Sequence, residues 1–363
     1  SISTPNPPQK FTVHTEHGIE RNDPYYWMNQ KENPEVLTHL KAENSYCEAQ
    51  QQHLKETRKT LYDEMLGRIQ EADTSAPVKQ DQYWYYTRTE EGRAYTLHCR
   101  KNGSLDADEQ VYLDENVLAD GLKYFHMSGM TVSPNHRYVA WLADVDGGER
   151  FVLFVKDLDT DQVLSHRMTD LKWGLAWAAD SETLFFCRSD SAQRPYKICR
   201  WSIHTAPETE VEVLHEPDER YFLTVSTTRD HAWVLLGCHS KQTSMVHAVD
   251  AHTPSKAPIL VRERRAEIEY HVAHRDGHFY ILHNDGAQNF KVTRRPTDDA
   301  SAPETEVVAH QADVHITDLD VFEHYLVVSE RFKGLPRLRI IDAGTGASSF
   351  INMPEEVYEV GPS

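Results

Sequence analysis

The stretch Pro134-Asn-His-Arg-Tyr-Val-Ala-Trp-Leu142 joins a polar turn to a short run of aromatic and β-branched residues. Proline and asparagine favour turns, and the run that follows is typical of a β-strand. The same combination recurs along the chain at intervals of 54, 45, 50, 46 and 47 residues. The turns are Gln80-Asp81, Pro134-Asn135, Ala179-Asp180, Arg229-Asp230, Arg275-Asp276 and Phe322-Glu323.

A second predicted strand follows the first in most of these repeats. The first strands lie at 83–87, 138–142, 183–187, 232–237, 278–282 and 325–329, and the second at 151–155, 196–199, 245–249, 290–292 and 338–341. A period of this length with several strands per unit is typical of a β-propeller. A single small sheet cannot bury both of its faces, whereas sheets stacked as blades cover one another.

The chain is therefore predicted to be mainly β, a β-propeller of about six blades behind a helical N-terminal extension. We expect blades near 77–125, 126–170, 171–219, 220–264, 265–311 and 312–356, with 357–363 beginning another. No Trp-Asp signature or kelch Gly-Gly pattern accompanies the repeat.

The first 76 residues are predicted to form a separate extension, and 77–363 the propeller with its last blade incomplete. Residues 1–30 are expected to be irregular, since they are rich in proline. Residues 33–71 are expected to form two helices or one bent helix. Asn33 is a good helix cap and Pro34 suits a first turn. Apolar residues then recur at roughly helical spacing.

Composition excludes several classes of partner. The chain has 38 Lys+Arg and 57 Asp+Glu, a formal net charge of −19. This charge repels nucleic acid and anionic lipid and attracts cationic ligands. No apolar run is long enough to span a membrane, and no signal peptide is recognised. The chain has five widely spaced cysteines, Cys47, Cys99, Cys187, Cys199 and Cys238. Their odd number and wide spacing predict reduced thiols and a cytoplasmic location.

The N-terminal third resembles oligopeptidase B, a member of the prolyl oligopeptidase family of serine peptidases. The resemblance rests on long motifs, and it continues weakly through the later blades. The matching segments are His17-Gly18, Arg21-Asn-Asp-Pro-Tyr-Tyr-Trp27, Glu32-Asn-Pro-Glu-Val-Leu37, Lys41-Ala-Glu-Asn44 with Tyr46, Glu64-Met65, Arg68-Ile69, Tyr83-Trp-Tyr-Tyr-Thr-Arg-Thr-Glu-Glu-Gly92, Tyr95 to Arg100, Val132-Ser-Pro-Asn135 and Glu356 to Ser363.

The resemblance implies a two-domain enzyme in which a seven-bladed propeller covers an α/β-hydrolase domain with a Ser-His-Asp triad. Such enzymes cut short peptides after Arg or Lys. The propeller gates access to the active site, and the N-terminal extension packs on the hydrolase domain. This sequence departs from the pattern because the hydrolase domain and most of the seventh blade are absent. The triad is thus expected beyond Ser363, and the chain alone is expected to be inactive.

The residues themselves agree with that expectation. A nucleophile elbow needs Gly-x-Ser-x-Gly, and neither Ser128 nor Ser348 is framed in this way. The sequence predicts no catalytic, cofactor-binding or metal-ligating residue and no cofactor. Expected partners are short basic peptides and the hydrolase domain of the same protein. The alternative is a stand-alone propeller that binds a protein partner without catalysis.

Three groups of residues were weighed as sites and interpreted as structural. His271, His274 and Asp276, with His278, are interpreted as a solvated hairpin end, and so are His247 and His252. Asp157, Asp159 and Asp161 match the first ligands of a calcium loop. Gln162 and Met168 stand where its glycine and final glutamate are required. The aromatic pairs Tyr83-Trp84 and Tyr85-Tyr86 are expected to pack within a blade.

Overall fold

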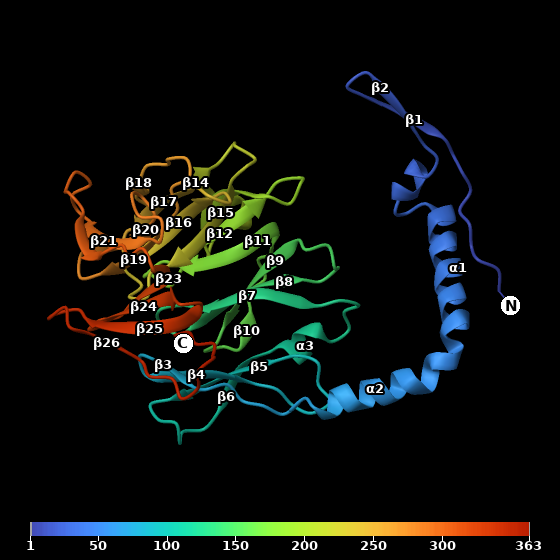
Figure 1. The fold of residues 1–363 in the computed structure, drawn as a ribbon. Helices are drawn as coiled ribbons and strands as arrows, with labels where there is room; N and C mark the ends of the chain where they lie inside the picture. The colour runs from blue at the N-terminus through green and yellow to red at the C-terminus, as the bar shows by residue number, and fades with distance from the viewer. Residues whose placement is uncertain (1, 363) are drawn as a thin grey trace. The chain divides into compact units, whose positions relative to one another are not determined.

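The computed structural model describes residues 2–362. Contacts divide the chain into two compact units. The first reaches Thr96 and also takes in Lys101–Ala107, and the second holds Leu97–Arg100 and the chain from Asp108 onward. Each unit is described by itself below (Figure 1).

The first unit begins with a β-hairpin, β1 (Thr12–Glu16) and β2 (Ile19–Asp23), followed by a short 3-10 helix, η1 (Tyr26–Asn29). The prediction that residues 1–30 are irregular is therefore wrong. His17 and Gly18 form the two-residue turn, with φ of 55° and 78°. A positive φ at both positions is what this kind of tight hairpin turn requires. The prolines lie outside the two strands.

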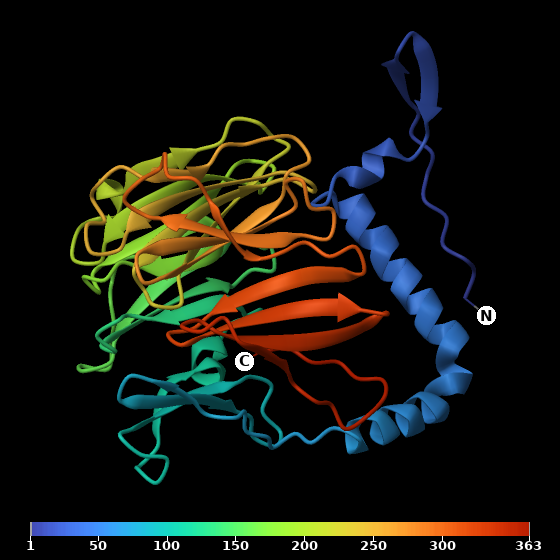
Figure 2. The same cartoon turned by 60° about the vertical axis from the view of Figure 1, so that its left-hand side comes forward.

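Two helices follow, as predicted for residues 33–71. They are α1 (Pro34–Gln51) and α2 (Lys55–Gly67), joined by the 3-10 turn η2 (Gln52–Leu54). The Asn33 side chain accepts a hydrogen bond from the Glu35 amide at 3.0 Å, which confirms the predicted cap. The helices change direction at η2, which is clear in both ribbon views (Figure 2).

Strands make up almost all of the remaining chain. The first unit adds β3 (Val78–Gln80) and β4 (Tyr83–Arg88), which pair in antiparallel. The other elements are β5 (Leu97–Asn102), β6 (Gln110–Asp114), α3 (Glu115–Ala119), β7 (His126–Val132), β8 (Tyr138–Asp144), β9 (Phe151–Asp157), β10 (Gln162–Val163), β11 (Met168–Trp177), β12 (Thr183–Ser189), β13 (Pro195–Ser202), η3 (Pro207–Thr209), β14 (Val211–His215), β15 (Phe222–Thr227), β16 (Trp233–His239), β17 (Ser244–Asp250), β18 (Ile259–Arg262), β19 (Tyr270–Arg275), β20 (His278–His283), β21 (Lys291–Pro296), β22 (Thr305–Val308), β23 (Val314–Val321), β24 (Tyr325–Phe332), β25 (Leu335–Asp342) and β26 (Ser348–Phe350).

These strands form the predicted series of four-stranded blades. The second blade is β7–β10, the third β11–β14, the fourth β15–β18, the fifth β19–β22 and the sixth β23–β26. Within each of the last three blades the strands pair in chain order. The second and third blades share one sheet, because β11 pairs with β9 near Met168 and with β12 from Leu171 onward.

The turn after each first strand repeats the same backbone conformation. A residue with positive φ stands at or just after the predicted turn in five repeats, at Asp81, His136, Ser181, His231 and Asp276. Asp and His are among the residues that tolerate this conformation best. The polar pairs that defined the repeat therefore mark real turns, but each turn lies between the first and second strands of its blade. The strands predicted to come first, such as 138–142 and 183–187, are the second strands of their blades.

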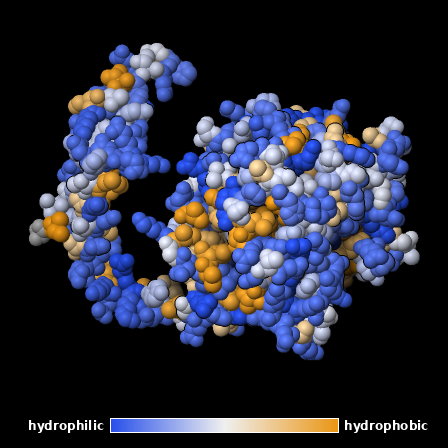
Figure 3. All heavy atoms as spheres, turned by 180° about the vertical axis from the view of Figure 1, so that it is seen from behind, coloured by the Kyte–Doolittle hydropathy of each residue, from blue (hydrophilic) through white to orange (hydrophobic). Residues whose placement is uncertain are grey.

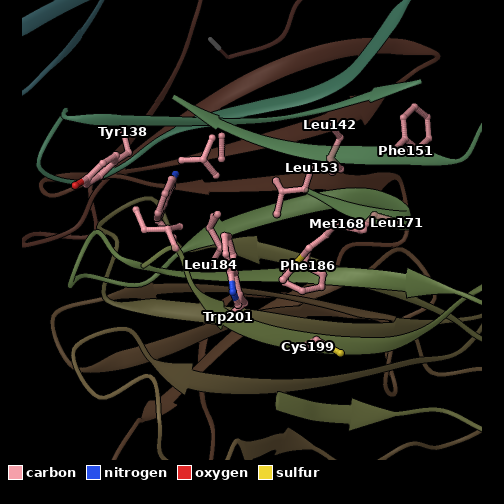
Figure 4. Close-up of a cluster of buried hydrophobic side chains, with 14 residues drawn as sticks. Tyr138, Leu142, Phe151, Leu153, Met168, Leu171, Leu184, Phe186, Cys199 and Trp201 are labelled. Atoms are coloured by element: carbon pink, nitrogen blue, oxygen red, sulfur yellow. The ribbon is translucent and has the colours of Figure 1, made fainter. Parts of the chain in front are cut away.

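Successive blades bury their apolar faces against one another. Leu142 and Leu153 of the second blade pack against Leu184 and Phe186 of the third, and each is at most 2% exposed (Figure 4). Separate clusters join the third blade to the fourth, the fourth to the fifth and the fifth to the sixth. Full burial of one such side chain stabilises the fold by about 1.5–3 kcal/mol, so the blades are held mainly by this packing.

Candidate substrate-facing site

The third blade exposes a tryptophan in the middle of its first strand. The pairing of β11 with β12 shifts register between Leu171 and Leu175, so Lys172-Trp173-Gly174 form a bulge. The Lys172 side chain is buried, and its ammonium donates to the Glu149 carbonyl at 2.6 Å and to Gln193 Oε1 at 2.7 Å. Trp173 is 47% exposed. The bulge thus anchors the lysine and leaves the aromatic ring available to a ligand.

Gly174 makes this bulge possible. Its φ is +100°, and a Cβ added there would lie 3.1 Å from both the Val225 carbonyl oxygen and Val225 Cγ1. A side chain at this position would therefore strain the backbone and press on the neighbouring strand β15. The exposed Trp173 therefore stands next to a glycine whose replacement would destabilise the fold.

A hollow of about 640 Å³ lies at the end of the fourth blade where β15 begins. Its walls come from the connections between blades and from the loop between β16 and β17. They are Arg220, Tyr221, Phe222, His239, Ser240, Lys241, Gln242, Thr243, Ala266 and Glu267. Phe222 is 45% exposed, so an aromatic surface faces the hollow.

The charges around this hollow are mixed. Arg220 is paired with Asp218 at 2.6 Å, and Lys241 and Glu267 stand on the loops that form the wall. Burial is the main cause that lowers the pKa of His239 to about 4, and the nearby His271 ring adds to this effect. His239 is therefore a neutral wall residue at neutral pH.

A second hollow, of about 650 Å³, lies at the opposite ends of the blades. It is lined by the turns after the first strands of the fourth, fifth and sixth blades, including Arg229, His274 and Phe322. His274 Nδ1 lies 2.6 Å from Asp230 Oδ2, which joins the fourth and fifth blades. Arg275 Nε donates to the Glu323 carbonyl at 2.7 Å, which joins the fifth and sixth.

The histidines singled out from the sequence do not share a site. His274 is buried against Asp230, so its interpretation as part of a solvated hairpin end is wrong. His271 lies near His239 instead, with ring centroids 6.4 Å apart. His247 is half-buried, and burial lowers its pKa, whereas His252 is exposed as expected. The alternation of side chains along one strand does not show which of its two faces is buried, because a neighbouring blade can cover either face.

The acidic turn after β9 is held by ion pairs within the blade. Arg137 donates three hydrogen bonds to Asp157, two from Nε and one from Nη2, and the shortest is 2.7 Å. This contact with Arg137 lowers the pKa of the Asp157 carboxyl. Asp161 is paired with Lys156 at 2.6 Å. Among the residues that the structure describes, no group of three or more His, Cys, Asp or Glu side chains is arranged to hold a metal ion.

Other sequence candidates are placed as follows. Ser128 lies on β7 and Ser348 on β26, so neither stands at a strand-to-helix turn. The four aromatic residues Tyr83, Trp84, Tyr85 and Tyr86 lie on β4 and are half-buried or buried, as expected for packing within a blade. Sequence reasoning missed Trp173, Phe222 and Lys241. The only signal for Trp173 was the glycine that follows it inside a predicted strand.

The helical segment exposes several large apolar side chains, and a few orange groups are visible along its mainly hydrophilic surface in Figure 3. Leu40 is 50% exposed, Leu61 51%, Met65 59% and Ile69 62%. Others on the same segment are Leu37, Leu54, Tyr62 and Leu66. Soluble proteins rarely leave such a series uncovered, which indicates a contact surface. Within residues 2–362, no helix is both long enough and apolar enough to cross a membrane.

Comparison with known proteins identifies the architecture. The family model for the prolyl oligopeptidase N-terminal beta-propeller domain matches residues 5–363. Dipeptidyl aminopeptidase BI of Pseudoxanthomonas mexicana is 31% identical over 97% of this chain and 51% of its own length. Protease 2 of Moraxella lacunata is 29% identical over 96% of the chain and 51% of its own length. The chain spans about half the length of these relatives.

Solved structures agree. Oligopeptidase B of Leishmania major superposes with a TM-score of 0.90 at 26% identity, over 98% of this chain and 54% of that protein. Oligopeptidase B of Trypanosoma brucei, solved with covalently bound antipain, gives a TM-score of 0.87 at 26% identity, over 97% and 54%. The matched region again covers the whole blade series and about half of each solved chain.

Proposed function

Because the chain belongs to the family of prolyl oligopeptidase N-terminal β-propeller domains, we propose that it is the propeller part of a serine oligopeptidase. The parent enzyme hydrolyses short peptides after Arg or Lys, with a Ser-Asp-His triad in an α/β-hydrolase domain beyond Ser363. Residues 1–76 form an extension that packs on that domain, and residues 77–363 form the propeller. The enzyme acts in the cytoplasm.

The observation that carries this proposal is a family match over nearly the whole chain that spans only about half of each relative. The exposed apolar residues of α1 and α2 support it, since a hydrolase domain would bury them. Leu61, Met65 and Ile69 would then form part of a contact between the extension and the hydrolase domain. Burial of each would stabilise that contact by about 1–2 kcal/mol.

The propeller restricts access to the active site and contacts the peptide. Trp173 and the hollow near Phe222 supply aromatic surface on which a peptide side chain can pack. The wall of the hollow carries both Lys241 and Glu267, so its local charge favours neither basic nor acidic side chains. The net charge of −19 attracts cationic peptides over a longer range, chiefly at low salt.

The test uses the full-length parent and a fluorogenic peptide with a single Arg. Trp173→Ala is expected to lower kcat/KM about tenfold, or about 1.4 kcal/mol. Trp173→Phe should restore most of the activity. Phe350→Ala is the matched control, because Phe350 is also 47% exposed but lies on the outermost strand of the sixth blade. Equal rates for Trp173→Ala and Phe350→Ala would remove the peptide contact from the proposal.

A fluorophosphonate probe tests the location of the chemistry, because it labels only an activated serine. We expect one label on the parent, beyond Ser363, and none on the chain alone. A label within residues 1–363 would overturn this part of the proposal. If the native protein has the mass of this chain and takes no label, the alternative of a stand-alone binding propeller is favoured instead.

A further inference from the structure

A smaller pocket between the fifth and sixth blades is rich in arginine. Its volume is about 270 Å³, several times the roughly 30 Å³ that one water molecule occupies in the liquid. The fifth blade contributes Tyr280, Arg294 and the segment Thr305–Val307 to the lining. The sixth blade contributes Arg339, Ile341 and Ser348. The strands that carry the arginines, β21 and β25, are labelled in Figure 1.

One carboxylate serves two of the nearby arginines. The Glu330 side chain is fully buried and contacts both Arg337 and Arg339. Arg337 Nε donates to Glu330 Oε2 at 2.9 Å. Glu330 Oε1, which faces Arg339, has no partner with hydrogen-bond geometry among the described residues. The Nε of Arg339 is likewise buried without a partner in residues 2–362. Arg339 is therefore only partly neutralised.

Arg294 is not neutralised at all. Arg294 Nη1 donates a hydrogen bond to the Tyr280 hydroxyl at 3.3 Å, and no carboxylate among the described residues lies within ion-pair distance. Two acidic residues, Glu306 and Asp342, also line the pocket, but neither forms an ion pair with Arg294. The Asp342 carboxylate accepts from the Gly344 and Thr345 amides at 3.0 and 2.8 Å, and Glu306 is exposed.

We propose that this pocket binds an oxyanion, the phosphate or carboxylate group of a small molecule. Guanidinium groups are suited to such anions because they present several donors in one plane. Arg294 and Arg339 would supply the charge, and the hydroxyls of Tyr280 and Ser348 would supply further hydrogen bonds. The lining also carries Glu306 and Asp342, so Arg294, which has no carboxylate partner among the described residues, is the feature that favours an anion here. The proposal is independent of the peptidase activity.

The experiment is isothermal titration of the full chain with inorganic phosphate and, separately, with succinate, at constant ionic strength in sodium chloride. Saturable binding of either anion is expected. Arg294→Gln should weaken it at least tenfold. Arg331→Gln is the matched control, because it removes the same charge from an exposed position on the sixth blade, outside the pocket. It should change the affinity less than twofold.

A second variant covers the case in which Arg294→Gln fails to fold. Ser348→Glu places a carboxylate at the pocket wall, where it should pair with the arginines, abolish anion binding and raise Tm. Phosphate binding without succinate binding would identify a phosphate site, and the reverse a carboxylate site. The proposal is overturned if neither anion binds, or if Arg294→Gln and Arg331→Gln bind equally.

Discussion

The Arg229 guanidinium reaches past the fifth blade to the sixth, where Nη2 donates to Asp320 Oδ1 at 2.6 Å. The same guanidinium lies 4.2 Å from the centre of the Phe322 ring. Arg229 belongs to the turn of the fourth blade, and 91 residues separate it from Asp320. The pair therefore bridges two blades that are not neighbours, at the hollow formed by the turns.

This bridge should be measurable by a double-mutant cycle with Arg229→Gln and Asp320→Asn. Both side chains are partly exposed, so solvent weakens the ion pair. We expect a coupling energy of about 0.5–1 kcal/mol from urea unfolding, decreasing at high salt. The exposed pair Arg220–Asp218 serves as a control, because it joins neighbouring residues within one loop. Additive effects for Arg229 and Asp320 would contradict the bridge.

Stability should fall as the pH falls, partly because of His283. This histidine is buried in the fifth blade, and burial is the main cause that lowers its pKa to about 4. Its Nδ1 accepts from the Asp285 amide at 3.2 Å, which leaves Nε2 to donate to Thr293 Oγ1 at 3.1 Å. The native state thus needs the neutral ring, whereas the unfolded chain protonates near pH 6.5.

The sign follows from the depressed pKa. The stabilising contribution of neutral His283 is complete above about pH 6.5 and is lost as the pH falls toward 4. We expect a loss of about 1–2 kcal/mol between pH 7 and pH 5, measured by urea unfolding. His283→Gln should reduce this loss, and His252→Gln, at an exposed position, should not. An unchanged pH dependence in His283→Gln would exclude this origin.

Gly174→Ala should destabilise the protein by about 2 kcal/mol or more, because φ is +100° and the added methyl group would meet Val225. Gly129→Ala is the matched control. Gly129 lies on β7, does not have a positive φ, and has nothing within 4 Å of an added Cβ. Urea midpoints compare the two. If Gly174→Ala is as stable as Gly129→Ala, the bulge that exposes Trp173 is not tightly constrained.

The isolated chain should associate through its helices. On α2, Leu61 is 51% exposed and Met65 is 59% exposed. The double variant Leu61→Glu, Met65→Glu is expected to aggregate less and to bind less of a dye that reports exposed apolar surface. The unfolding midpoint of the blades should stay the same, because neither side chain is buried in this chain. Light scattering at rising concentration measures the effect. In the full-length parent the same double substitution should instead lower stability.

Thiol chemistry should be confined to one residue. Cys47 is exposed, whereas Cys99, Cys187, Cys199 and Cys238 are buried. Burial raises the pKa of the last three to about 12. The thiolate is the reactive form, so the buried cysteines should react slowly. After brief treatment with iodoacetamide, the intact mass of the chain should show one alkylated cysteine. The Cys47→Ser variant should show no alkylation under the same conditions. Two or more fast adducts would show that a blade opens in solution.

Much of this fold could be predicted from local sequence. Asn33-Pro34 marks the start of α1, and the polar pairs from Asp81 to Asp276 mark the turns of the blades, because capping and positive φ are properties of a few neighbouring residues. The repeat length then fixes the architecture, since isolated four-stranded sheets need stacked neighbours. The hairpin β1–β2 was missed although His17-Gly18 carried its turn signal.

Tertiary structure alone decided which side chains the stacked blades bury and which they expose. From the sequence, Trp173 is one more strand residue, and only the shift in the pairing of β11 with β12 leaves it exposed. From the sequence, His274 is expected at a solvated hairpin end, whereas in the structure it is buried and contacts Asp230 of the fourth blade. The reach of Arg229 to Asp320 likewise depends on two blades that are far apart in sequence. Local sequence sets backbone conformation, whereas burial and charge pairing depend on what the rest of the chain places nearby.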